Sequence, residues 1–336
     1  MTTNLKQGLL LKGAKLHPEI DGSVQGIVLI TLGISIFSIQ DVLIRTLGST
    51  YPGFEIMFFR GLVAIVPIFV FVIFSGGLET LKVSHPWLNI LRGLLALTSY
   101  TFYYMALQAL PLAVSTAIFF LSPLIVTLLS VIFLRETVGI RRMAAVLAGF
   151  VGVMMIVGPT DGDVSAEMIL PILAAVAYAI SIIITRHIGK SQTGSSLAFY
   201  AMSTFIVVSG LAGLFLGGQT DAASHHPSIA FLLRDWVVPT AGDAFLIAVC
   251  GVISAFGFYC LAQGYRISPV SVVAPFDFVA MPLAVFWGFL VWAEVPSGLT
   301  LSGILVIIFS GIYVLQREAR PDRKRLTTGR SVRLRL

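Results

Sequence analysis

One apolar segment occurs twice in this chain, and this repetition limits the possible folds more than any other feature. The segment FYYMALQALPLAVSTAIFFLSPLIVTLLSVIFLRE ends at Glu136, and FYCLAQGYRISPVSVVAPFDFVAMPLAVFWGFLVWAE ends at Glu294, 158 residues later. The same offset places Pro111 on Pro269. A duplicated membrane half is typical of secondary transporters, whose substrate site lies where the two halves meet.

The composition excludes an ordinary soluble globular protein. Apolar residues make up 57% of the chain and charged residues 11%, and the mean hydropathy is +0.95. Several windows are long enough to cross about 30 Å of hydrocarbon, and lipid requires each of them to be a helix. We therefore predict an all-α integral membrane protein with ten transmembrane helices, at approximately 24–46, 53–75, 87–108, 112–134, 141–159, 166–186, 196–217, 242–265, 269–292 and 298–316.

The basic residues predict the orientation. With the N-terminus in the cytoplasm, 19 of the 22 lysines and arginines lie in cytoplasmic segments, while Arg45 and Arg234 lie outside and Arg60 lies within a helix. The positive-inside rule therefore places both termini in the cytoplasm. The net charge of +6 comes from inner loops and the tail, so it predicts no nucleic-acid partner. The basic tail, residues 317–336, could contact anionic lipid.

Most charged residues lie near the ends of the predicted helices, but three lie further inside, at Asp41, Arg60 and Asp277. A charge at mid-membrane costs a few kcal/mol, about 3 on insertion scales, so its default interpretation is functional. Asp41 and Arg60 could meet at one level, either as a structural ion pair or as part of a substrate site. Asp277 could carry a coupling proton, or it could hydrogen-bond in a structural role to carbonyls that the prolines leave free.

Two prolines, Pro123 and Pro282, lie near the middle of the fourth and ninth helices. Proline removes a backbone donor and kinks a helix, although membrane helices tolerate this where neighbours satisfy the freed carbonyls. Matched interruptions in two halves indicate a transport site.

Polar and aromatic side chains mark the faces that would line such a site. Ser38 and Asp41 belong to a polar stripe along the first helix, and Tyr178 and Ser181 share a face of the sixth. Aromatic residues at such spacing often serve only for packing. The candidate substrate-binding or gating residues are Phe37, Ser38, Asp41, Arg60, Tyr100, Tyr103, Tyr104, Phe119, Tyr178, Ser181, Phe276 and Asp277.

Other kinds of site find little support in the sequence. His225 and His226 lack a third ligand at useful spacing, so we predict no metal site. No GxxxxGK[ST] loop is present to bind ATP, and no HExxH motif favours a membrane-embedded enzyme. No cofactor is expected.

The loop segment 228–236 predicts a short interfacial helix capped by Ser228.

Several motifs resemble the ten-helix EamA-type branch of the drug/metabolite transporter superfamily. They are FFRG at 58–61, MALQALPLAVSTAIFFLSPLIVTLLSVIFLRE at 105–136, GFVG at 149–152, AQG at 262–264 and SPVSVVAP at 268–275. The resemblance covers about residues 24–316. It implies two inverted five-helix repeats around a cavity lined by helices 1, 3, 4, 6, 8 and 9, with helices 5 and 10 at the periphery. Small multidrug-resistance relatives carry a glutamate on helix 1 where this chain has Phe37, so their mechanism does not transfer directly.

These observations together predict the organisation and function. We expect a cytoplasmic segment 1–23, repeats at 24–160 and 161–316, and a cytoplasmic tail 317–336. The expected function is secondary transport of a small polar or zwitterionic metabolite across the inner membrane by alternating access, as a monomer or homodimer, with a proton as a candidate coupling ion. Amino acids and betaine-, adenosylmethionine- or flavin-like compounds fit this expectation. The alternatives are a multidrug or organic-cation exporter, and a membrane-embedded enzyme or scaffold.

Overall fold

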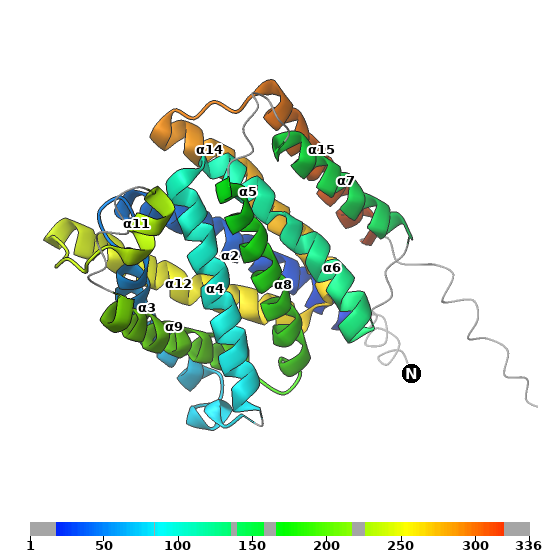
Figure 1. Cartoon of the computed structure of the whole chain (residues 1–336). Coiled ribbons are helices and arrows are strands. Elements are labelled where there is room, and N and C mark those ends of the chain that lie inside the picture. Colours follow the sequence, from blue (N-terminus) through cyan, green and yellow to red (C-terminus); the bar gives the residue numbers. More distant parts are fainter. Residues whose placement is uncertain (1–17, 84, 136–139, 158–165, 217–225, 319–336) are drawn as a thin grey trace, which may run out of the picture.

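A computed structural model describes residues 18–83, 85–135, 140–157, 166–216 and 226–318. Within these ranges the chain is helical and contains no strand (Figure 1). The longer helices are α2 (Pro18–Leu47), α3 (Gly53–Phe74), α4 (Pro86–Ala109), α5 (Leu112–Phe119), α6 (Leu121–Leu134), α7 (Ile140–Val157), α8 (Ile169–Ile188), α9 (Gly194–Leu216), α12 (Ala241–Ile267), α14 (Ala280–Trp292) and α15 (Gly298–Glu318). The short elements are η1 (Leu78–Leu81), η2 (Ala166–Met168), α11 (Pro227–Leu233), α13 (Val270–Val273) and η3 (Ala274–Val279).

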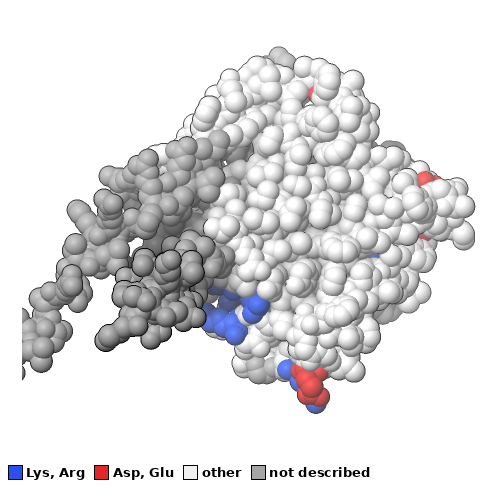
Figure 2. Space-filling view, turned by 180° about the vertical axis from the view of Figure 1, so that it is seen from behind, with Lys and Arg blue, Asp and Glu red and all other residues white. Residues whose placement is uncertain are grey.

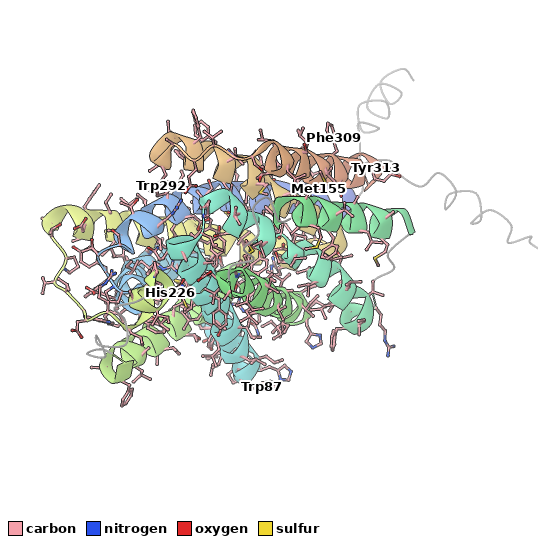
Figure 3. The ribbon with its side chains drawn as sticks, turned by 45° about the horizontal axis from the view of Figure 1, so that its top comes forward. Trp87, Met155, His226, Trp292, Phe309 and Tyr313 are labelled. Atoms are coloured by element: carbon pink, nitrogen blue, oxygen red, sulfur yellow. The ribbon has the colours of Figure 1, made fainter. Side chains whose placement is uncertain are left out.

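Several helices have the length and composition of membrane spans. Six spans in the described part of the chain meet both requirements, and two shorter apolar helices follow at Phe276–Trp292 and Gly298–Ser310. Large apolar side chains such as Phe309 are exposed on the outside of the bundle (Figure 3), as expected for a surface that contacts lipid. The six spans are Val24–Leu47, Gly53–Phe74, Leu112–Leu134, Ala166–Ile188, Gly194–Phe215 and Ala241–Ile267.

Two local predictions differ from the observed structure, one at α2 and one at α11. The helix α2 begins at Pro18, six residues before the first apolar window. The short helix α11 begins at Pro227 and makes no side-chain cap. The prediction that Ser228 caps it is therefore wrong, because the Ser228 hydroxyl donates to the Met105 carbonyl at 2.8 Å and thereby fastens α11 to α4.

Helices distant in sequence pack in pairs. The pairs are α2 with α12, α4 with α8, α3 with α9, and α7 with α15. The α7–α15 pair lies at one edge of the molecule, where it contacts the other helices mainly through η3, α5 and α6 (Figure 1). The remaining helices enclose the interior between them.

Glycines allow α2 and α12 to approach each other closely. A Cβ atom added at Gly26 would lie 3.3 Å from the Gly264 carbonyl oxygen, and one at Gly264 would lie 3.1 Å from the Gly26 carbonyl oxygen. Two turns further along, a Cβ at Gly257 would lie 2.6 Å from the Phe37 ring, and one at Gly33 would lie 3.4 Å from the Gly257 carbonyl oxygen. We call these four residues the glycine seam. Its small residues permit backbone contact, as is common between membrane helices.

The two ends of the bundle are formed by different elements. The α11 end carries α11 and the C-terminal end of α2, where Arg234 donates to the Gly48 carbonyl at 3.1 Å. The opposite end carries the beginning of α4 and the end of α8. On the face shown in Figure 2, lysines and arginines gather at the lower edge and most of the described surface is uncharged.

Candidate functional site

A cavity of about 80 Å³ lies between helices from both halves of the sequence. This volume is enough for several water molecules. Because α2, α4, α5, α8, α12, η3 and α14 all contribute to its wall, we call it the central cavity. Its lining residues are Ile34, Phe37, Ser38, Asp41, Ser99, Tyr100, Tyr103, Thr116, Phe119, Phe120, Tyr178, Leu261, Asp277 and Ala280.

The structure places most of the sequence candidates at or beside this cavity. Ser181 lines a second cavity next to it, and Phe276 packs on the hydrophobic core instead of lining either one. Arg60 and Tyr104 are buried behind the central wall. The candidates that line the central cavity are Phe37, Ser38, Asp41, Tyr100, Tyr103, Phe119, Tyr178 and Asp277.

Two carboxylates face the central cavity, one from each half of the sequence. Asp41 on α2 accepts a hydrogen bond from the Tyr103 hydroxyl at 3.2 Å. Asp277 in η3 accepts one from the Tyr265 hydroxyl at 2.7 Å, and its second oxygen, Oδ1, is buried without a partner. Neither carboxylate forms an ion pair with any cation of the described residues. The cavity therefore contains two acidic groups that no cation of the described residues contacts directly.

Aromatic rings form much of the remaining wall. Phe119 stacks at an angle between Tyr103 and Tyr178, with ring centroids 5.1 and 5.4 Å away. On another side, Phe37 and Tyr100 lie 5.9 Å apart. The face of an aromatic ring attracts cations, so rings and carboxylates in one cavity favour the same charge of ligand.

Arg60 does not form the ion pair with Asp41 that the sequence suggested. Its side chain is fully buried, and its guanidinium carbon lies 5.4 Å from the Tyr104 ring centroid and 5.5 Å from that of Tyr100. Nη1 donates to the Tyr104 hydroxyl at 3.3 Å and to the Gln40 side-chain carbonyl at 2.7 Å. Aromatic faces and a neutral amide therefore hold this cation behind the cavity wall.

The Gln40 amide joins three helices around Arg60. Its carbonyl accepts from Arg60 and from the Tyr104 hydroxyl, and its NH₂ group donates to the Ser254 hydroxyl at 2.7 Å and to the Cys250 carbonyl at 3.0 Å. This orientation satisfies all four neighbours. The result is a buried polar network that links α2, α3, α4 and α12 directly behind Tyr100.

The two spans that contain Pro123 and Pro282 are both interrupted, whereas α3 continues through Pro67. The span that contains Pro123 is divided into α5 and α6 at Phe120, three residues before the proline. The span that contains Pro282 passes through the 3-10 helix η3, which carries Asp277, before α14 begins. A proline cannot donate to the carbonyl four residues earlier and its ring clashes there, which accounts for breaks at these places. Pro123 is buried, whereas Pro282 is exposed.

At the α11 end a charged cluster lies about one helical turn beyond the central cavity. Glu294, just beyond α14, accepts from Arg45 at 2.7 Å and from the Leu112 backbone N–H at 3.1 Å. The Arg45 guanidinium also lies over the Trp292 ring, 4.2 Å from its centroid. Arg45 and Leu112 each stand one helical turn beyond a cavity residue, Asp41 and Thr116. We call Arg45, Leu112, Trp292 and Glu294 the end cluster.

Sequence reasoning missed several of these groups. Gln40 and Tyr265 lie in apolar helices without any distinguishing motif, and the sequence placed Arg45 on the outer side without a partner. The duplicated position of Glu294 was the one available signal for the end cluster. Glu136, the counterpart of Glu294 in the first half, lies outside the described residues. So does His225, one of the two adjacent histidines considered above as metal ligands. Within those residues, no group of three or more histidine, cysteine or acidic side chains could hold a metal ion.

Comparison with known proteins yields several similar transporters. A riboflavin transporter of Rhizobium johnstonii is 26% identical over 248 residues, which cover 74% of this chain and 76% of that protein. An S-adenosylmethionine uptake transporter of Rickettsia bellii is 27% identical over 256 residues, covering 76% and 81%. A pseudopaline exporter of Pseudomonas aeruginosa is 26% identical over 225 residues, covering 66% and 72%.

The fold and the family agree with these similarities. One crystal structure matches with a TM-score of 0.67 and 17% identity, covering 90% of this chain and 98% of that chain. The EamA-like transporter family matches residues 24–158 and again residues 165–316. These two matches cover nearly the whole apolar part of the sequence, and the chain therefore belongs to the EamA-like transporter family.

Proposed function

We propose that this protein is a secondary transporter that moves a small organic cation or zwitterion through the central cavity. The observation that carries this proposal is the pair of carboxylates, Asp41 and Asp277, which face one aromatic-lined cavity without a cationic partner. Buried charge without a partner is costly in a membrane protein and usually marks the path of a substrate or ion. A positively charged substrate would supply the missing partner.

Among small metabolites, compounds with a cationic centre and a ring fit this cavity best. An S-adenosylmethionine-like compound has a sulfonium, an ammonium group and an adenine ring, so it could use both carboxylates and the aromatic wall. Betaine-like compounds and amino acids have the charge without the ring. A flavin-like substrate is uncharged at the ring and leaves the carboxylates without an evident purpose. We therefore favour the adenosylmethionine-like class.

Alternating access would follow from two inverted five-helix repeats, residues 24–160 and 161–316. In support, the two non-glycine residues of the described chain with positive φ are Arg135 (53°) and Ala293 (54°), 158 residues apart. Each ends the helix that follows an interruption. A local backbone conformation is thus repeated at the same offset as the sequence.

The helix contacts also support the repeat. Exchanging the halves turns α2 into α8, α3 into α9, α4 into α12 and α7 into α15. This exchange converts the α2–α12 pair into the α8–α4 pair, and it leaves the α3–α9 and α7–α15 pairs unchanged. A two-fold axis between the halves would produce such a pattern, as in transporters built from inverted repeats.

The proposed orientation has ten transmembrane helices in the inner membrane, with both termini cytoplasmic and the α11 end outside. The distribution of basic residues in the sequence supports it. In this orientation the end cluster closes the outer side of the central cavity. Asp277 would carry the coupling proton if transport is proton-driven.

Export of organic cations is the second candidate function. An acidic, aromatic cavity suits many cations, and one similar protein is an exporter. Direction and breadth of substrate separate the two functions, because an exporter of this kind would accept unrelated aromatic cations as readily as a metabolite.

Uptake by the reconstituted protein tests the proposed function. We expect proteoliposomes to accumulate labelled S-adenosylmethionine, with competition by other sulfonium and ammonium metabolites and weaker competition by riboflavin. Equal competition by an unrelated cation such as tetraphenylphosphonium would favour the exporter. Transport of anions alone, or absence of transport for the entire panel, would contradict the proposal.

The end cluster yields a prediction about access to the cavity. Replacing Glu294 with glutamine removes an ion pair whose side chains are 17% and 22% exposed, and such a pair contributes about 1 kcal/mol. We expect a roughly fivefold faster reaction of a cavity cysteine, Ser38→Cys, with a membrane-impermeant maleimide added outside. Cys250 and Cys260 would first be replaced by alanine.

The matched control is Glu79→Gln, which removes the exposed Lys82–Glu79 pair of 2.8 Å on η1. It should leave the labelling rate unchanged. If Glu294→Gln has no effect, or if Glu79→Gln has the same effect, the end cluster does not close the cavity.

A further inference from the structure

Arg92 is a buried arginine that the transport site described above does not use. It lies on α4 near the end opposite α11, with 4% of its surface exposed. One Nη donates to the Leu197 carbonyl and the other to the Thr185 hydroxyl at 3.5 Å. Its Nε has no partner, and no acidic side chain of the described residues pairs with it. Two of its five N–H groups are therefore used, both by neutral acceptors.

This arginine lines a second cavity, which adjoins the central one. The second cavity has a volume of about 30 Å³ and is lined by Arg92, Ser181 and Thr185, among others. Tyr100 and Tyr178 line both cavities. Arg92 precedes Tyr100 by eight residues, or about 12 Å along α4. The second cavity therefore lies between the central cavity and the end of the bundle opposite α11.

A purely structural role does not require a guanidinium here. The offset of 156–158 residues that relates α4 to α12 places the uncharged residues 248–250 (Ala, Val, Cys) at the corresponding position. A buried cation without a counter-ion is costly. The planar fork of arginine matches the two oxygens of a carboxylate or phosphate, and the Nε–H of Arg92 has no acceptor of its own.

We propose that Arg92 forms an oxyanion subsite that binds the carboxylate of the transported zwitterion between the central cavity and the end opposite α11. This inference rests on the proposed transport function and assigns a location to the substrate's negative group. The cationic group would be attracted to Asp41 and Asp277, and the anionic group to Arg92. The space of the second cavity is about that of two water molecules, comparable to a carboxylate.

Binding of a simple carboxylate to the purified protein tests the subsite without any transport assay. The probes are benzoate and its neutral counterpart benzamide, measured by titration calorimetry. We expect the wild-type protein to bind benzoate at least tenfold more tightly than benzamide, and Arg92→Gln to remove this preference. Equal affinities in the wild-type protein, or an unchanged preference in Arg92→Gln, would overturn the proposal.

Two further variants make the result specific. Lys190→Gln removes an exposed positive charge at the same end of α8 and should keep the preference. If Arg92→Gln does not fold, Arg92→Lys carries the test, because it keeps the charge but loses the fork; its preference should fall at least threefold, and full preference would refute the subsite. Loss of transport for every metabolite would contradict the proposed function alone, since benzoate binding is measured independently.

Discussion

Asp277→Asn is expected to lower uptake of a cationic substrate by about 30-fold or more. Asp277 is 5% exposed and one of its oxygens has no partner. Losing the charge opposite a desolvated cation costs about 2 kcal/mol or more, which corresponds to that factor. The protein should remain folded, because asparagine still accepts the hydrogen bond of Tyr265, which is 2.7 Å long in the native protein. Initial uptake rates and the thermal unfolding midpoint measure the two effects.

The same variant separates binding from proton coupling. If Asp277 binds the substrate cation, both net uptake and substrate exchange will fall. If it carries the coupling proton, the response to a proton gradient will disappear while exchange persists. The control is Asp235→Asn, which removes an exposed carboxylate near α11. Unchanged uptake, exchange and gradient response in Asp277→Asn would show that this carboxylate is structural.

Replacing Arg60 should separate stability from transport. Arg60→Ala removes a fully buried side chain and leaves a void, so we expect a loss of about 2–5 kcal/mol in unfolding free energy. Arg60→Met keeps most of the volume and removes a buried cation that has no ion-pair partner, and its stability should stay within about 1 kcal/mol of the wild-type value. Both variants should transport at least tenfold more slowly, because Tyr100 and Tyr104 lose the cation that they enclose.

Thermal unfolding in detergent, together with uptake, measures these effects. Leu62→Ala, an exposed position on the same helix, is the control for truncation and should change neither. A methionine variant with normal transport would assign Arg60 to packing alone. A methionine variant as unstable as the alanine variant would show that the charge itself stabilises the fold.

The sequence located the charges of the site better than it located their partners. Asp41 and Asp277 could be identified because placing an acidic residue in an apolar membrane helix costs free energy, so that such residues are rare and usually functional. Their hydrogen-bond partners depend on which tyrosine of a neighbouring helix points inward, and this is decided by packing between helices. Arg60 shows the same limit: its burial in a helix was predicted, but its contacts with Gln40 and two aromatic rings were not.

Groups near helix ends were the most difficult to interpret. Arg92 was counted with the cytoplasmic cations because it follows the beginning of its helix by only six residues. The structure buries it against α8 and α9 instead. Arg45 and Glu294 are separated by 249 residues, so no local pattern could pair them. The depth of a charged residue along its own helix can be counted from the sequence. Which residue of a neighbouring helix it contacts is known only from the tertiary structure.

The glycine seam bears on which parts of the protein can move together. Its four glycines bring the backbones of α2 and α12 into contact, although these helices come from different halves of the sequence. If one of these helices slid by a single residue, side chains would replace the glycine hydrogen atoms at the contact and would collide with the backbone of the other helix. The duplication in the sequence therefore does not divide the protein into two independent rigid bodies, because the seam joins a helix of the first half of the sequence to a helix of the second.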